Sequence, residues 1–134
     1  MKVQLKQVED NTYVGKGDSN HWVVVDTSAK DDGHDAGTGP MELVLIALAG
    51  CTAMDVESIL KKKRAPLKKL EVEAAADRAE SLPRRFTNIH LTYKIRGDVR
   101  QEDAEHAVSL SQEKYCSVAG SLNAMITHEI KIIP

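Results

Sequence analysis

Residues 37–60, GTGPMELVLIALAGCTAMDVESIL, decide the fold of this chain. Pro40 stands where proline is favoured at the start of a helix, and Glu42 follows in the first turn, where a carboxylate complements the helix dipole. The next residues are apolar all round, which predicts that this half of the helix is surrounded by protein. The basic residues 61–64 suit the last turn, and Pro66 marks its end. We therefore expect one long apolar helix at the centre of the chain.

Segments of alternating apolar and polar residues lie on both sides of this helix. Residues 1–28 contain three of them, separated by turn residues, and predict a three-stranded meander. Residues 67–80 and 89–95 predict two further strands, and residues 126–133 predict a last one.

Two shorter helices are expected before the last strand. Asp98 offers an N-cap with Gln101 three residues later, a variant of the capping box. A second helix is expected to begin around Cys116, with an apolar stripe of Val118, Leu122 and Met125. The resulting order, βββ-α-ββ-αα-β, predicts a single α+β domain over residues 1–134.

The composition excludes several classes of protein. Eighteen Lys plus Arg against 20 Asp plus Glu give a net charge of −2, without the basic excess that nucleic-acid binding needs. The N-terminus is polar, which indicates no signal peptide, and the apolar run at residues 43–50 is shorter than the ~20 residues that cross a membrane. We expect a cytoplasmic protein without a membrane partner, in a compartment that keeps thiols reduced.

The two cysteines are the main candidates for chemistry. No His or Cys stands at a metal-binding spacing, so neither a metal nor another cofactor is expected. Cys116 falls at a predicted helix start, where free N–H groups stabilise a thiolate. Cys51 follows Ala49 and Gly50, which let a substrate or another backbone approach closely. From the residues alone, the two cysteines are either buried core groups or a pair that cycles between thiols and a disulfide.

Two motifs resemble those of a known family. Residues 37–60 resemble the signature helix of the OsmC/Ohr family, and residues 113–122, EKYCSVAGSL, resemble its second cysteine segment. The order of elements also matches, so the resemblance covers essentially the whole chain. It is greatest to the subgroup of redox proteins rather than to the well-characterised hydroperoxide reductases.

The resemblance implies both a fold and an activity. The fold would be an OsmC-like α+β domain in an intertwined homodimer, with both active sites at the subunit interface. Cys51 would attack an organic hydroperoxide and become a sulfenic acid. Cys116 would then form a disulfide with it, and an external dithiol would reduce that disulfide.

The chain departs from the family at the residues that would activate the first cysteine. Hydroperoxide reductases carry a Glu directly after the proline, where this chain has Met41, and Glu42 comes one position later. Nine positions of ideal helix put Glu42 on roughly the opposite face from Cys51 and about 13 Å along the axis. Glu42 would therefore either cap the helix or act on the cysteine of a partner subunit.

The family's arginine is also missing, because the first 63 residues contain none. Lys16 is the nearest substitute, and Arg84 and Arg85 at a predicted turn are a second possibility. Asp55 lies one helical turn after Cys51, and a nearby carboxylate raises the pKa of a thiol. It is expected to oppose ionisation of Cys51 unless a cation pairs with it.

Two functions are compatible with these residues. The first is a cysteine-based hydroperoxide reductase. The second is a protein that keeps the fold with weak catalysis and binds an apolar ligand, or senses oxidants, at the dimer interface.

Overall fold

The computed structural model describes the whole chain, Met1–Pro134. It forms two compact units, Met1–Val44 and Leu45–Pro134, which are described separately. The boundary falls inside α1 (Pro40–Lys62), the long helix predicted from the sequence. The order of the strands and α-helices is βββ-α-ββ-αα-β, as predicted, with two single-turn helices added, η1 (Ala29–Asp31) and η2 (Ser111–Tyr115). That both units act as one domain stays a prediction.

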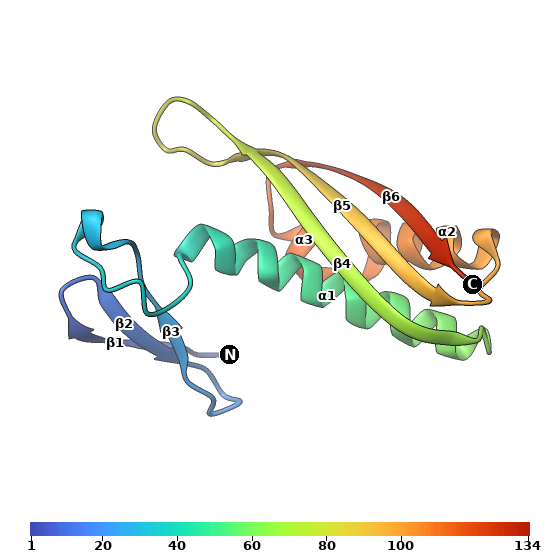
Figure 1. Cartoon of the computed structure of the whole chain (residues 1–134), viewed down its shortest axis with the longest axis horizontal. Helices are drawn as coiled ribbons and strands as arrows, with labels where there is room; N and C mark the ends of the chain where they lie inside the picture. Colours follow the sequence, from blue (N-terminus) through green and yellow to red (C-terminus); the bar gives the residue numbers. More distant parts are fainter. The chain divides into compact units, whose positions relative to one another are not determined.

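The first unit is built on a small antiparallel sheet. Its strands β1 (Gln4–Glu9), β2 (Thr12–Lys16) and β3 (Val23–Val25) follow one another in the sheet as in the chain, which confirms the predicted meander (Figure 1). Asp26, only 2% exposed, directly follows β3. Its carboxylate accepts hydrogen bonds from three backbone N–H groups, those of Thr27, His34 and Ala36. This side chain therefore organises the loop between β3 and α1.

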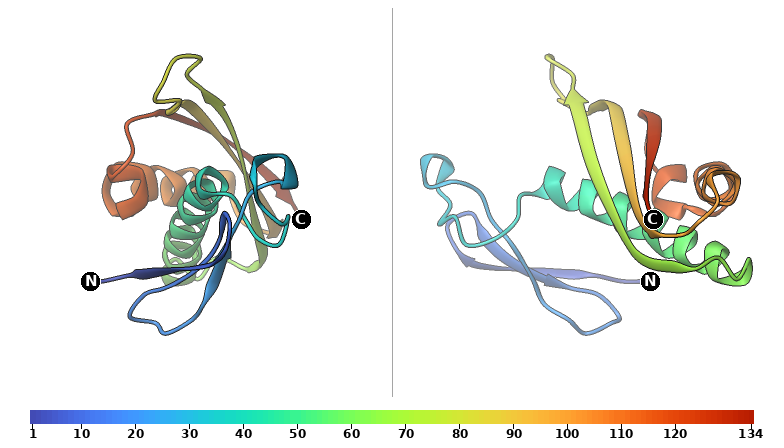
Figure 2. Two further views of the ribbon diagram at one scale, coloured as in Figure 1. Left: turned by 90° about the vertical axis from the view of Figure 1, so that its left-hand side faces the viewer. Right: turned by 45° about the vertical axis from the view of Figure 1, so that its right-hand side comes forward.

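The second unit is a three-stranded sheet with helices on one face. The strands are β4 (Leu67–Arg78), β5 (Phe86–Gly97) and β6 (Met125–Ile133), in the order β4-β5-β6. β5 pairs antiparallel with β4 and parallel with β6. A parallel neighbour requires a long crossover, which α2 (Gln101–Leu110), η2 and α3 (Ser117–Gly120) provide. Figure 2 shows the three strands side by side, with α2 next to β6.

The core of this unit lies between the sheet and the helices. Alternate residues of β5 are fully buried, as the period of a half-buried strand requires. The face of α1 that carries Leu48, Val56 and Leu60 is buried as well, and so are Ala104 and Val108 of α2. The buried β5 residues are Ile89, Leu91, Tyr93 and Ile95.

Two predictions about the shorter helices are wrong. α2 begins at Gln101 with Arg100 as its N-cap, so Asp98 lies too early to cap it. Val99 is 5% exposed, and its burial carries the chain past Asp98 before the helix starts. α3 is a single turn, and Met125 begins β6 instead of completing a helical stripe.

A single chain does not cover all of the apolar half of α1, so the expectation that protein surrounds this half stays a prediction about the homodimer. The side chains of Ile46 and Met54 are 58% and 75% exposed. An 18-residue window of α1 has a mean hydropathy of 1.9 with 22% of it buried, so the apolar stretch is longer than residues 43–50. By length and composition α1 passes the test for a membrane span, a test that core helices of soluble proteins also pass. Within this chain, α1 is covered on the sides that meet the sheet and the α2–α3 crossover, and the remaining side is exposed.

Candidate active site

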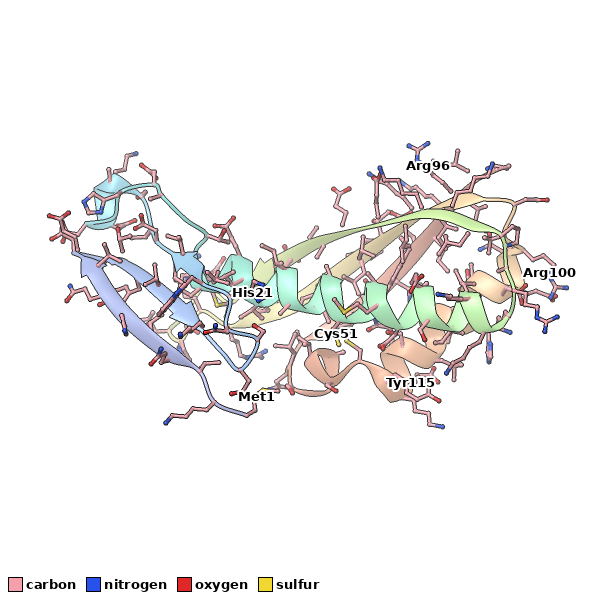
Figure 3. The ribbon with its side chains drawn as sticks, turned by 90° about the horizontal axis from the view of Figure 1, so that it is seen from below. Met1, His21, Cys51, Arg96, Arg100 and Tyr115 are labelled. Atoms are coloured by element: carbon pink, nitrogen blue, oxygen red, sulfur yellow. The ribbon has the colours of Figure 1, made fainter.

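The fold brings the two cysteines into one cluster within the second unit. The Sγ atoms of Cys51 and Cys116 and a carboxylate oxygen of Asp55 all lie within 4.8 Å of one another. Both cysteines are free thiols, with Cys51 half-buried and Cys116 5% exposed. Figure 3 shows Cys51 midway along α1 and Tyr115 in the segment that leads to Cys116. Because a disulfide has an S–S length of about 2.05 Å, a modest movement of the two side chains would join them.

The turn between α2 and α3 positions Cys116. η2 continues α2 as one wide π-helical turn, a feature often found at functional sites. Its end is fixed by the N–H group of Cys116, which donates to the carbonyl of Ser111 at 2.8 Å. Cys116 is then extended, with φ −72° and ψ 98°, and is the N-cap of α3. Its Sγ accepts a hydrogen bond from the N–H group of Ala119 at 3.4 Å.

This position does not favour a Cys116 thiolate as the sequence predicted. Burial raises the pKa of Cys116 to about 11 and outweighs the lowering effect of the Ala119 N–H group. The neighbouring Cys51 sulfur and the negative charge of Asp55 raise it further. One weak N–H donor at a four-residue helix therefore does not offset the loss of water around the sulfur.

A buried polar network adjoins the sulfur cluster. Thr52 Oγ1 lies 2.7 Å from Tyr93 Oη and 2.8 Å from Ser111 Oγ, and all three residues are fully buried. Ser111 Oγ donates to Asp55 Oδ2 at 2.9 Å. Gln112 Nε2 donates to Thr52 Oγ1 at 3.1 Å and to Tyr93 Oη at 2.9 Å. The network joins β5, η2 and α1 and ends at the carboxylate beside the two cysteines.

Sequence reasoning identified Asp55 but missed the residues that hold it. Tyr93 occupies a buried position of a strand whose other inward residues are aliphatic, and Thr52 is a polar residue in the most apolar helix. Buried hydroxyls are almost always hydrogen-bonded, so these two positions indicated that a buried hydrogen-bond network exists. The partner of each could not be known before the fold placed Ser111 and Gln112.

The other candidate residues have local partners. Glu42 Oε1 accepts from the Gly39 N–H group at 3.2 Å, which is the geometry of a helix cap. Lys16 Nζ donates to Asn20 Oδ1 at 2.9 Å and lies 4.8 Å from the ring centroid of Trp22. Both residues belong to the first unit, and any action on Cys51 stays a prediction. Arg84 and Arg85 donate to backbone carbonyls of Ala79, Phe86 and Asn123.

An open cavity of about 250 Å³ gives Asp55 contact with solvent. Its lining residues come from α1, α2 and η2 and are Asp55, Ser58, Ile59, Lys62, Leu110 and Tyr115. The cavity therefore gives small molecules access to the carboxylate end of the cluster.

Metal binding is the other chemistry that such a cluster allows. Zinc accepts thiolate and carboxylate ligands, so Cys51, Asp55 and Cys116 are the residues that could hold an ion. No other feature of the site points to a metal, and the expectation of a metal-free protein stays a prediction.

Comparisons with known proteins agree with this architecture. The family described as OsmC-like protein matches residues 33–131. Protein YhfA of Escherichia coli (strain K12) is 39% identical over 136 residues, covering 99% of this chain and 98% of that protein. A hypothetical protein from Aquifex aeolicus VF5 has a crystal structure with a TM-score of 0.82 at 32% identity, covering 99% of this chain and 97% of that one. The organic hydroperoxide resistance protein OhrB of Bacillus subtilis has the same fold, with a TM-score of 0.67 at 19% identity over 97% and 96% of the two chains. The resemblance predicted from the two cysteine motifs is thus confirmed, and the chain belongs to the OsmC-like protein family.

Proposed function

We propose that this protein reduces organic hydroperoxides with Cys51 and Cys116 as its redox pair. The observation that carries the proposal is that the two sulfur atoms and the Asp55 carboxylate lie within 4.8 Å of one another. A structural relative named as an organic hydroperoxide resistance protein supports the choice of substrate class.

The proposed reduction of a hydroperoxide has three steps. The Cys51 thiol attacks the O–O bond of the hydroperoxide, which releases an alcohol and leaves a sulfenic acid on Cys51. The Cys116 sulfur then displaces the sulfenic hydroxyl as water and forms the Cys51–Cys116 disulfide. An external dithiol finally reduces this disulfide and is itself oxidised to a disulfide.

The environments of the two thiols support the proposed assignment of their roles. Cys51 is the more accessible sulfur, whereas Cys116 is 5% exposed and burial raises its pKa to about 11. A thiol that is protonated and shielded is a poor first nucleophile, because the thiolate is the reactive form. Cys51 therefore attacks the peroxide, and Cys116 resolves the sulfenic acid.

Counting thiols in matched variants tests the proposal. One equivalent of cumene hydroperoxide should convert both free thiols of the reduced protein into an intramolecular disulfide. Cys116→Ser should stop at the sulfenic acid, which dimedone traps, and Cys51→Ser should leave Cys116 reduced. Two free thiols persisting under excess hydroperoxide would exclude the peroxidase function.

The exposed apolar surface of α1 supports the proposal of a homodimer. Ile46 and Met54 would remain in water in a single chain, although burying a large apolar side chain stabilises by about 1.5–3 kcal/mol. A second copy in a cytoplasmic dimer would cover them. Light scattering after gel filtration should give a dimer for the wild type, and Ile46→Glu should shift it toward the monomer.

Binding of an apolar ligand is the second candidate function. The first unit has an open, mostly apolar groove of about 440 Å³, lined in part by Leu5, Val23, Val25 and Leu43. If Cys51→Ser clears hydroperoxide as well as the wild type does and a fluorescent fatty acid binds with 1:1 stoichiometry, this function replaces the peroxidase.

A further inference from the structure

The hydrogen bonds of the buried network have only one possible direction. Asp55 as a carboxylate can only accept, so the single proton of the Ser111 hydroxyl points to Asp55 Oδ2. Ser111 Oγ must then accept from Thr52, and Thr52 Oγ1 must accept from Tyr93. Gln112 Nε2 donates to the oxygens of Thr52 and Tyr93, which is consistent with this direction. Three buried hydroxyl groups therefore donate in series toward one carboxylate.

The hydroxyl groups of Tyr93, Thr52 and Ser111 hold the Asp55 carboxylate in position and leave its negative charge in place. Successive hydroxyl donors polarise one another, and hydrogen bonds to a charged acceptor are about twice as strong as neutral ones. The Ser111 donor occupies Oδ2 and leaves Oδ1 free for another partner. Both sulfurs lie within 4.8 Å of the Asp55 carboxylate, so a free proton acceptor stands beside the redox pair.

The resolving step needs such a group. When the Cys116 sulfur attacks the sulfenic acid, its thiol must lose a proton and the departing hydroxide must gain one. Burial raises the pKa of the Cys116 thiol, so a proton acceptor close to its sulfur would assist the loss of this proton. The five histidines, the usual general bases, do not belong to the sulfur cluster.

We propose that Asp55 is the acid–base residue of disulfide formation, held in position by the Tyr93–Thr52–Ser111 hydroxyl series. Its carboxylate accepts the proton of the Cys116 thiol while the Cys116 sulfur bonds to Cys51. It then returns this proton to the hydroxide that leaves Cys51, which departs as water. No oxidant is consumed beyond the hydroperoxide of the first step. The inference rests on the proposed function and adds a residue to its second step.

The substitution Asp55→Asn distinguishes this role from a purely electrostatic one, because the two roles predict opposite changes in the rate of disulfide formation. As a nearby negative charge, Asp55 raises the pKa of Cys116, so its removal alone would ionise this thiol more readily and speed disulfide formation. As a proton acceptor, Asp55 speeds the same step, so its removal slows it. Asparagine has nearly the shape of aspartate, and its carbonyl oxygen can still accept from Ser111.

The test follows the two steps separately after rapid mixing of reduced protein with one equivalent of cumene hydroperoxide. Dimedone trapping with mass spectrometry measures the Cys51 sulfenic acid, and quenched alkylation measures the disulfide. We expect Asp55→Asn to accumulate sulfenic acid and to form the disulfide at least 10-fold more slowly, since general acid–base groups contribute 10²–10⁴-fold. Glu57→Gln removes an equal charge from an exposed position of α1 and should leave both steps unchanged.

Disulfide formation in Asp55→Asn at the wild-type rate or faster would overturn the inference. A wild-type protein that forms neither sulfenic acid nor disulfide would instead overturn the proposed function, so the two failures are distinct. The wild type provides a further test if Asp55→Asn does not fold. Its disulfide step should be slower in D₂O, and equal rates in the two solvents would also contradict a proton transfer in this step.

Discussion

Replacement of Thr52 by valine tests the buried network through stability. Valine has nearly the shape of threonine but cannot hydrogen-bond, so the change leaves packing intact and removes the centre of the network. The Tyr93 O–H group, fully buried, loses its acceptor at 2.7 Å, and Ser111 loses its donor at 2.8 Å. An unsatisfied buried donor costs about 1–3 kcal/mol, and a lost hydrogen bond costs about 1 kcal/mol. Thr52→Val should therefore lower the free energy of unfolding by about 2–4 kcal/mol.

A double-mutant cycle with Tyr93→Phe isolates the hydrogen bond itself. Tyr93→Phe removes the group that Thr52→Val would leave unsatisfied, so the double variant should lose about 1–2 kcal/mol less than the sum of the single variants. Urea unfolding followed by circular dichroism at one protein concentration measures these values. Thr127→Val, on the exposed face of β6, is the matched control. It removes only an exposed hydrogen bond to His90 Nδ1 at 2.8 Å, which water can replace, and should stay within about 0.5 kcal/mol of the wild type. Additive losses in the double variant, or a Thr52→Val protein as stable as the control, would refute the network as described.

Three further predictions concern titration. Burial raises the pKa of Cys116 from 9.0 to about 11. Iodoacetamide at pH 8 should therefore modify this thiol about 100-fold more slowly in the native protein than in urea, because the thiolate is the reactive form. Equal rates would contradict its burial. The same shift means that the native state holds this proton more tightly, so its contribution to stability is complete below pH 9 and is lost as the pH rises toward 11. Burial raises the pKa of Asp26, but three backbone N–H donors lower it more, to about 2. The stabilisation that the Asp26 carboxylate provides is therefore present above pH 3.8 and is lost as the pH falls toward 2. The difference in thermal midpoint between the wild type and Asp26→Asn should accordingly shrink between pH 5 and pH 2. The hydrogen bonds of Arg100 lower the pKa of Asp103, so Arg100→Ala should raise that pKa in an NMR titration, with Lys63 at 3.5 Å retaining part of the shift.

The sequence predicted those parts of the fold that depend on local rules. Alternation in β4 and β5, the Pro40 helix start and the turn residues of the first unit each act over a few residues, and the structure has all of these elements. The Asp98 cap was wrong because burial of Val99, a tertiary effect, shifted the start of α2. The exposure of Ile46 in a single chain was not predictable either, because hydrophobicity favours the burial of a side chain but does not say which element or chain would bury it.

The candidate site was predictable only in part, for a different reason. Nothing in the spacing of Cys51 and Cys116 requires them to meet, and the expectation that they do came from the resemblance of their two motifs to a family. The polar partners of Asp55 come from three separate elements, and only the crossover that makes β6 parallel to β5 brings η2 beside α1. The sequence can indicate that a buried hydroxyl such as that of Tyr93 needs a hydrogen-bond partner, but the topology of the fold determines which residue is that partner.

The departures from the family pattern and the position of Asp55 have a common chemical consequence. The chain has no Glu directly after Pro40 and no Arg in its first 63 residues, so it lacks the two activating residues that the resemblance to hydroperoxide reductases implies. It places instead a carboxylate, held by three hydroxyls in series, against both sulfurs. A negative charge in that position raises the pKa of the Cys116 thiol, so this thiol does not ionise readily by itself. The same group favours the second step, in which a proton must leave one sulfur and reach an oxygen on the other. Asp55→Asn should therefore slow the second step, so that the Cys51 sulfenic acid forms and then accumulates. A slowing confined to one step of the reaction is a signature that a general loss of structure would not produce.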